Sequence, residues 1–346
     1  MPLRNVQIVP GFNKADTPSG AEGQWIDGDF VRFRYGQPEK IGGFQAIGTD
    51  TISGPTRAQH TWTDLEGNRY AALGTSKALY IYYEDKFYDV TPLATAITGA
   101  TFTSTQNSNT VTVTKSSHGL DVGEYITFTS VTLPGGGATG YTTANFTDFT
   151  FEILTVPTTS TFTIQMKTNE TGTGMSTAGS ASINPYEEVG PTIQTYGYGW
   201  GTGTWGRGTW GSGTTSSTVI LDPGSWSLDN FGQQLVATVK DGKTFVWNPA
   251  VSNPLTVRAT LMTGAPTATR LTITSDRDRH VVHFGTETTI GDTTTQDPMF
   301  IRFSDQENFS VYQPTSVNTA GTFRLDTGNK IVAAVSGKDY NLILTD

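Results

Sequence analysis

A strand-turn-strand unit recurs along this chain and is interrupted once by a long threonine-rich block. The clearest copies span Tyr70–Val90, Leu235–Trp247, His280–Tyr312 and Ile331–Leu344. Apolar and aromatic residues flank short polar turns such as Glu84-Asp85, Asp241-Gly242 and Gly337-Lys338, and Asp-Gly between apolar runs is a strong hairpin signal. Because one such unit cannot bury a face alone, the copies must stack on their neighbours, as in a propeller or a sandwich.

The composition favours the same fold class. The chain has 346 residues, 39 of them glycine, with abundant Thr, Tyr, Phe and Trp, and these residues favour strands and tight turns over helices. No segment shows the period of about 3.6 residues that a helix longer than about two turns would have. We therefore predict an all-β protein in which a propeller-like platform of blades carries an inserted β-barrel or sandwich domain.

Several function classes are disfavoured by composition alone. The chain has no cysteine, which removes disulfides, thiol nucleophiles and cysteine-ligated metals. It shows neither a signal peptide nor an apolar run of about 18 residues, so we expect a soluble protein made in a cytosol, without a membrane anchor. A net charge of −9 argues against a surface that wraps nucleic acid, since that affinity comes from Lys and Arg on phosphates. A wall past which DNA slides is still allowed.

The pattern divides the chain into four parts. We assign residues 1–93 to an N-terminal segment and the first blade or blades, 94–189 to the threonine-rich insert, 190–218 to a Gly/Trp-rich loop and 219–346 to further blades. In the insert, Thr110–Thr114 alternates strictly between Thr and Val, which predicts half-buried strands. The last residues, Asn341–Asp346, lie within an apolar strand, so we expect the sequence to be a fragment of a longer protein.

The segment Gln24–Phe44 predicts a strand that enters a Gly-Gln-Pro turn. It contains Trp25, the string Val-Arg-Phe-Arg at 31–34, Gly-Gln-Pro at 36–38 and Glu-Lys-Ile-Gly-Gly-Phe at 39–44. This combination resembles the N-terminal segment of tail and stabilisation proteins of tailed bacteriophages. From charge pattern alone, the alternative is an edge strand whose arginines pair with nearby acids.

Two further resemblances extend along the chain. Tyr70–Val90 with its Gly-Thr corner and Val-Thr-Pro exit is similar to one propeller blade of the tail nozzle, or tail tubular protein B-like, family of short-tailed phages, and the later blades look alike. The strings 118–126 and 161–164 of the insert resemble a small β-barrel module of phage structural proteins, also likened to a half-domain of ubiquitin-activating enzymes. That likeness implies no such activity, since thioester chemistry needs a cysteine.

The Gly/Trp-rich loop holds three Trp-Gly-x-Gly-Thr repeats, which begin at Trp200, Trp205 and Trp210. Glycine at this density excludes a helix, so we expect a ribbon that runs along a surface or across a neighbouring subunit. Stacking of these tryptophans on sugars or bases is the alternative. Residues 201–206 match the dinucleotide fingerprint in form only, because no strand-helix context surrounds them.

The sequence offers no organised catalytic constellation. His280 and His283 lie three residues apart on an expected strand, so their rings should point to opposite faces. His118, beside a glycine at a turn, should hydrogen-bond its own loop rather than bind a metal. Paired carboxylates for glycoside cleavage need only be close in space, so Asp222, Asp229, Asp276 and Asp305 stay open as candidates. We predict no catalytic residue, no metal site and no cofactor.

The phage resemblance implies a structural virion protein that assembles in the bacterial host cytoplasm. It implies a homo-oligomeric, hexameric tail nozzle below an adaptor protein, with a lumen that retains and conducts double-stranded DNA, and it allows contacts with tail fibres. We assign Arg32, Arg34 and Lys40 to contacts with a neighbouring ring or subunit, and Trp200, Trp205 and Trp210 to packing between subunits. The alternative function is a phage host-recognition protein that binds or cleaves surface carbohydrate, and a free propeller enzyme is a third.

Overall fold

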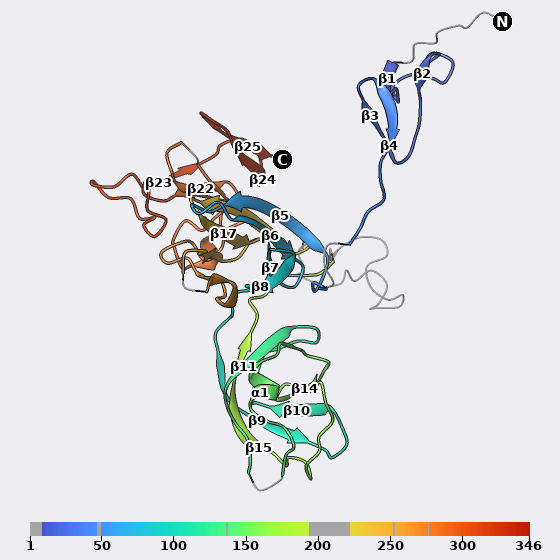
Figure 1. Cartoon of the computed structure of the whole chain (residues 1–346). Helices are drawn as coiled ribbons and strands as arrows, with labels where there is room; N and C mark the ends of the chain where they lie inside the picture. The colour runs from blue at the N-terminus through green and yellow to red at the C-terminus, as the bar shows by residue number, and fades with distance from the viewer. Residues whose placement is uncertain (1–8, 47–49, 136–137, 194–221, 252, 276) are drawn as a thin grey trace, which may run out of the picture. The chain divides into compact units, whose positions relative to one another are not determined.

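The computed structural model describes residues 9–46, 50–135, 138–193, 222–251, 253–275 and 277–346 (Figure 1). It divides into two units, Met1–Thr49 and Asp50–Asp346. Within the described residues the only α-helix is a single turn, α1 at Ala144–Thr147, and the other elements are strands and two short 3-10 turns. The prediction of an all-β fold without long helices is confirmed.

The smaller unit is built from two pairs of short strands. β1 (Val9–Phe12) pairs in parallel with β2 (Gln24–Trp25), and β3 (Val31–Arg34) forms an antiparallel hairpin with β4 (Gln37–Lys40). The hairpin turn is Tyr35-Gly36, both with positive φ, as a two-residue hairpin turn requires. The expected Gly-Gln-Pro turn is therefore shifted, because only Gly36 accepts that conformation without strain and Pro38 lies within β4.

Three four-stranded antiparallel sheets form the blades of the larger unit, and each runs in simple sequence order. The first blade comprises β5 (Thr56–Thr63), β6 (Arg69–Thr75), β7 (Leu79–Tyr83) and β8 (Lys86–Asp89). The second comprises β16 (Trp226–Phe231), β17 (Gln234–Val239), β18 (Thr244–Trp247) and β19 (Thr260–Leu261). The third comprises β20 (Leu271–Thr274), β21 (Val281–Phe284), β22 (Phe300–Phe303) and β23 (Gly321–Arg324), and a hairpin of β24 (Ile331–Ser336) and β25 (Asn341–Thr345) follows.

The blades stack through separate apolar cores, as the repeat predicts. Trp62 of the first blade and Trp247 of the second share one core, Val236 and Val281 join the second blade to the third, and Phe284 and Ile331 join the third to the last hairpin. Gly74 allows the first and second blades to pack closely, because a Cβ at position 74 would come within 2.5 Å of the Trp226 indole. The Trp226 Nε1 then donates to the Thr75 carbonyl at 3.0 Å. The Gly-Thr corner of the sequence is thus a packing site between blades.

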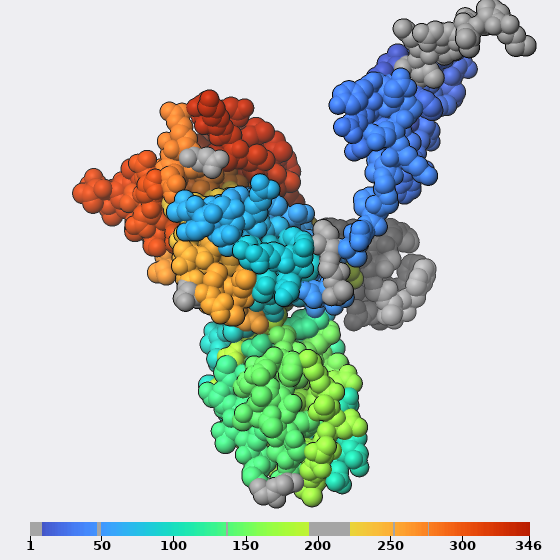
Figure 2. All heavy atoms as spheres, in the orientation of Figure 1, coloured from blue at the N-terminus to red at the C-terminus, as the bar shows by residue number. Residues whose placement is uncertain are grey.

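The insert is a seven-stranded antiparallel sheet with the order β12-β11-β15-β9-β10-β14-β13. Its strands are β9 (Ile97–Ser104), β10 (Thr110–Thr114), β11 (Tyr125–Thr132), β12 (Phe151–Glu152), β13 (Thr155–Thr158), β14 (Thr161–Gln165) and β15 (Ala178–Pro185). The two edge strands, β12 and β13, are consecutive in sequence, so the sheet curls round on itself (Figure 1). It encloses its own core, in which Phe102, Phe128 and Phe146 are fully buried, and its atoms gather in a body of their own (Figure 2).

Candidate functional site

Two chain segments join the insert to the blades, and they form a short paired stalk. Leu93 bridges Tyr186 in antiparallel fashion. The Ala94 amide donates to the Pro185 carbonyl at 2.8 Å, and the Glu187 amide donates to the Pro92 carbonyl at 2.9 Å. The insert thus enters and leaves at one point, beside the first blade.

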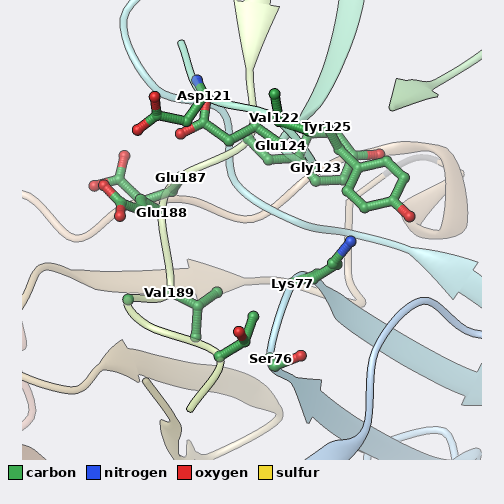
Figure 3. A pocket seen from close by; sticks show the side chains of 13 residues that line it. Ser76, Lys77, Asp121, Val122, Gly123, Glu124, Tyr125, Glu187, Glu188 and Val189 are labelled. Atoms are coloured by element: carbon green, nitrogen blue, oxygen red, sulfur yellow. The ribbon is translucent and has the colours of Figure 1, made fainter. Parts of the chain in front are cut away.

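A pocket of about 410 Å³ opens where the insert meets the blades. The first blade contributes Ser76 and Lys77, the insert contributes 121–125, and the stalk contributes 186–190 together with Thr192. Figure 3 shows the carboxylates of Asp121, Glu187 and Glu188 at one end of this space and Lys77 at the other. The pocket is therefore a gap between two packed bodies, lined by charged side chains and also by Val122 and Val189.

The charges around this gap are only partly compensated. Lys77 Nζ lies 3.0 Å from Glu152 Oε1 and 5.1 Å from the centre of the Tyr125 ring, and Lys243 Nζ lies 2.8 Å from Glu187 Oε1. Burial raises the pKa of the Glu124 carboxyl, and the nearby charges of Glu188 and Asp121 add to that rise. The insert side of the gap is thus acidic and the blade side is basic.

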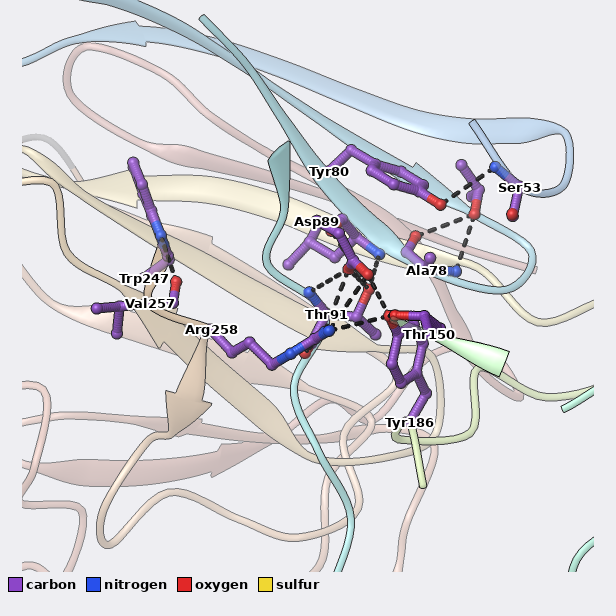
Figure 4. A network of polar contacts seen from close by, with 12 residues as sticks. Ser53, Ala78, Tyr80, Asp89, Thr91, Thr150, Tyr186, Trp247, Val257 and Arg258 are labelled. Atoms are coloured by element: carbon purple, nitrogen blue, oxygen red, sulfur yellow. Dashed lines mark hydrogen bonds and ion pairs between the residues drawn. The ribbon is translucent and has the colours of Figure 1, made fainter. Parts of the chain in front are cut away.

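Beside the pocket, a network of polar contacts joins three parts of the structure (Figure 4). Arg258, which precedes β19 in the second blade, donates to Asp89 Oδ1 at 3.3 Å and to the Thr91 carbonyl at 2.9 Å. Its other terminal nitrogen lies 3.0 Å from the hydroxyl of Tyr186. That hydroxyl also bonds Asp89 Oδ2 and lies 2.9 Å from Thr150 of the insert.

Burial and charge shift the pKa values in this network. Burial raises the pKa of the Tyr186 hydroxyl, and the neighbouring carboxylate of Asp89 adds to the rise. Burial alone would lower the pKa of Arg258, but the charges of Asp89 and Tyr186 and the hydrogen bonds to both together outweigh it, and the pKa is raised. Arg258 therefore stays a cation and Tyr186 a neutral hydroxyl over the ordinary pH range. These groups hold parts together and are unsuited to proton transfer at neutral pH.

Sequence reasoning missed this network because its members are far apart in the chain. Arg258 and Asp89 are separated by 169 residues, and Tyr186 and Asp89 by 97. Of these residues, only Asp89 is adjacent to a motif that the sequence analysis identifies, the Val-Thr-Pro exit of the first blade. An ion pair between two blades produces no recognisable pattern in the local sequence around either residue.

The structure places the N-terminal candidate residues on one hairpin but on two faces. Arg32 lies opposite Glu39 and pairs with it at 3.2 Å, and Arg34 lies opposite Gln37, with its guanidinium 5.3 Å from the Tyr35 ring. Lys40 lies opposite Val31, and alternation puts both on the other face. Arg32 and Arg34 therefore share an exposed face that Lys40 does not.

The remaining candidates have structural partners or lie outside the described residues. Trp200, Trp205, Trp210 and Asp276 belong to the undescribed part. Asp222 bonds Lys240 and Arg270, Asp229 accepts from the Thr274 amide at 2.7 Å, and Asp305 accepts from Thr319. These three carboxylates are thus occupied by contacts that hold the blades.

His118 makes the loop contact that the sequence predicts, whereas His280 lies just before β21 (Val281–Phe284) and not within the strand. His118 Nδ1 accepts from the Leu120 amide at 3.0 Å, which confirms the predicted loop contact. His283 is completely buried, with Nδ1 2.9 Å from the Thr272 hydroxyl, whereas His280 is partly exposed and Nδ1 lies 2.8 Å from the Ser304 carbonyl. Across the described residues, no group of three or more His, Asp or Glu side chains has a metal-binding arrangement, and no described helix could span a membrane.

Comparisons with known proteins identify no family and find a distant structural neighbour. No protein-family model matches the sequence, and no curated protein matches it. Among solved structures, the endosialidase of phage phi92 aligns with 89% of this chain at 12% identity, with a TM-score of 0.26. The aligned part is 43% of that chain, so this chain spans less than half the length of the endosialidase.

Proposed function

We propose that this protein is a structural virion protein of a tailed phage, part of a tail nozzle that retains and conducts genomic DNA. The observation that carries the proposal is the β3–β4 hairpin of the unit Met1–Thr49, which exposes the arginines of the Val-Arg-Phe-Arg string and leads into Ile-Gly-Gly. A hairpin with unpaired edges and exposed arginines suits a contact with a neighbouring subunit.

The rest of the fold supports the same role. Stacked blades with three buried cores make a rigid wall, and a net charge of −9 lets a negatively charged duplex pass, since like charges repel. The blade carboxylates that could have served glycoside cleavage are engaged with Lys240, Arg270 and Thr319. In this role the protein would act through assembly rather than catalysis.

The test is the state of the purified chain in solution. The proposal predicts ring-shaped assemblies by negative-stain electron microscopy and no release of sugar from bacterial surface polysaccharide. A monomer that quenches its tryptophan fluorescence saturably on addition of such a polysaccharide would instead support the carbohydrate-binding alternative.

A further inference from the structure

The insert and the blades have separate apolar cores. The core of the insert is drawn wholly from residues between 97 and 183, and the core at the root of the blades from residues between 58 and 90 and between 189 and 259. The pocket of about 410 Å³ lies between them. Since interfaces between domains that are small and polar leave relative motion as the default, something other than apolar packing must hold the insert in place.

The contacts across the gap are polar. Lys77–Glu152 is an exposed pair whose side chains are 28% and 43% accessible, and such pairs contribute little because water screens them. In the second pair, Lys243–Glu187, the lysine side chain is also exposed, with 41% of it accessible. Each pair has one side chain that is more than 40% accessible, although Glu187 is only 14% accessible.

The Tyr186 contact differs in geometry, because it adds a buried ring and hydroxyl to the Arg258–Asp89 pair, whose side chains are 25% and 26% accessible. Tyr186 is anchored in the insert, because its amide donates to the Tyr125 carbonyl at 2.9 Å, and it is only 9% exposed. Its ring lies under the Arg258 guanidinium at 4.7 Å, and its hydroxyl bonds both Arg258 and Asp89. The side chain of Tyr186, where the stalk joins the insert, thus meets a charge pair of the blades.

The other half of this contact is fixed within the blades. The Ala259 amide donates to the Val90 carbonyl at 2.9 Å, which ties the residues next to Arg258 and Asp89 together. Asp89 also accepts from the Thr91 amide and hydroxyl at 3.0 and 2.6 Å. The receiving pair is therefore preformed whether or not Tyr186 is present.

We propose that Tyr186 on Arg258 and Asp89 is a latch that fixes the orientation of the insert, and that the insert swings about its two-segment stalk when the latch is open. The two packed bodies stay folded in both states, because neither core contributes to the other. The pocket of about 410 Å³ is the space into which the insert moves, and the ion pairs of Lys77 and Lys243 adjust to either state.

The absence of cysteine from the chain makes a distance measurement direct. Cysteines introduced by Ser116→Cys in the insert and Leu65→Cys in the first blade, both exposed positions, would carry spin labels for double electron-electron resonance. The wild-type background should give one narrow distance peak. Tyr186→Phe, which removes only the hydroxyl, and Arg258→Met, which removes the receiving cation, should each lose that peak and give a broad distribution.

Arg270→Met is the matched control, because Arg270 is also mostly buried and ion-paired, to Asp222 and Asp241, but lies away from the stalk. It should keep the narrow peak, and near-ultraviolet circular dichroism should show folded blades in all variants. A narrow peak in both latch variants, or equal broadening in Arg270→Met, would overturn the proposal. Loss of the narrow wild-type peak at high salt would also overturn the proposal. It would show that the exposed ion pairs hold the insert, because salt screens such pairs.

Discussion

Arg258 lies over the ring of Tyr186, with its guanidinium carbon 4.7 Å from the ring centre. The two residues belong to different bodies, one to the blades and one to the stalk of the insert, and Asp89 bonds both. This contact shows how an interrupted repeat is assembled: the blades stack through apolar cores, and the insert is attached through polar side chains at its root. The predictions below test both kinds of attachment.

Removal of residues 94–185, with a short Gly-Ser linker in their place, should leave the blades folded. The ends of the excised segment are close, since Ala94 and Pro185 share a backbone hydrogen bond of 2.8 Å, and an insert with its own core is separable. Trp62, Trp226 and Trp247 are buried in the blades, so their fluorescence should report cooperative unfolding. A gradual transition would mean that the block is part of the blade core.

An excision that extends to residue 189 should leave the blades folded but less stable. Val189 is 4% exposed and belongs to the core shared by the first two blades, so its loss leaves a cavity that costs about 1–3 kcal/mol of unfolding free energy. Denaturant unfolding of the two excision variants should show this difference. Equal stability would contradict the placement of Val189 in that core.

Glu170 should be the most sensitive polar position in the insert. It is completely buried and accepts from the Ser104 and Thr139 hydroxyls and the Gly172 amide, at 2.8 to 2.9 Å. Burial alone would raise its pKa, but the hydrogen bonds that it accepts, first those from the Gly140 and Gly172 amides, lower it. Glu170→Ala leaves several buried donors unpaired, which should cost about 3 kcal/mol. Hydrogen exchange in 94–185 should speed up, while the exposed Asp148→Asn control leaves it unchanged.

His283 should make the blades sensitive to acid. Complete burial, together with the charge of Arg302, lowers the pKa of its imidazole to about 3, from an ordinary value of 6.5. Below pH 6.5 the imidazole binds a proton in the unfolded chain but stays neutral in the folded chain. The contribution of His283 to the free energy of unfolding is therefore fully present above pH 6.5 and is lost as the pH falls toward 3. The slope is about 1.4 kcal/mol per pH unit.

Denaturant unfolding between pH 7 and pH 4 measures this slope. His283→Gln should flatten it relative to the wild type, even if the variant is less stable at pH 7, because the variant has no group to protonate there. His280→Gln, at a partly exposed position, is the control and should keep the wild-type slope. An unchanged slope in His283→Gln would show that other groups set the acid response.

Reversal of Arg32 and Arg34 to glutamate should weaken assembly without changing the affinity for duplex DNA. The reversal puts like charges across a protein contact, but it also breaks the Arg32–Glu39 pair within the hairpin. A second variant, which adds Glu39→Arg to the two reversals, restores an ion pair between positions 32 and 39 and keeps both reversed positions negative. Both variants should assemble less well in sedimentation. Sub-micromolar DNA binding that disappears in the variants would place this hairpin on the DNA-facing wall, since each phosphate contact adds salt-dependent affinity.

The sequence was most informative where structure is local. The hairpins at Glu84-Asp85 and Asp241-Gly242 form as expected, because Glu84, Asp85 and Asp241 adopt the positive φ angles that such turns require. Most outer strands of the blades lie outside the predicted copies, namely β5, β16, β19, β20 and β23, whereas β8 lies within Tyr70–Val90. β19 and β23 have weak periodicity, and β5 follows a turn-rich stretch. The contact of Tyr186 with Arg258 and Asp89 could not be predicted, since it depends on where separate blades place three side chains.

The central proposal is that this chain functions by assembling with copies of itself into a ring. Analytical ultracentrifugation over micromolar concentrations, followed by negative-stain microscopy of the same sample, tests it most directly. We predict particles several times the 37.2 kDa of one chain, ring-shaped in projection. A single species of 37.2 kDa at every concentration would contradict the proposal.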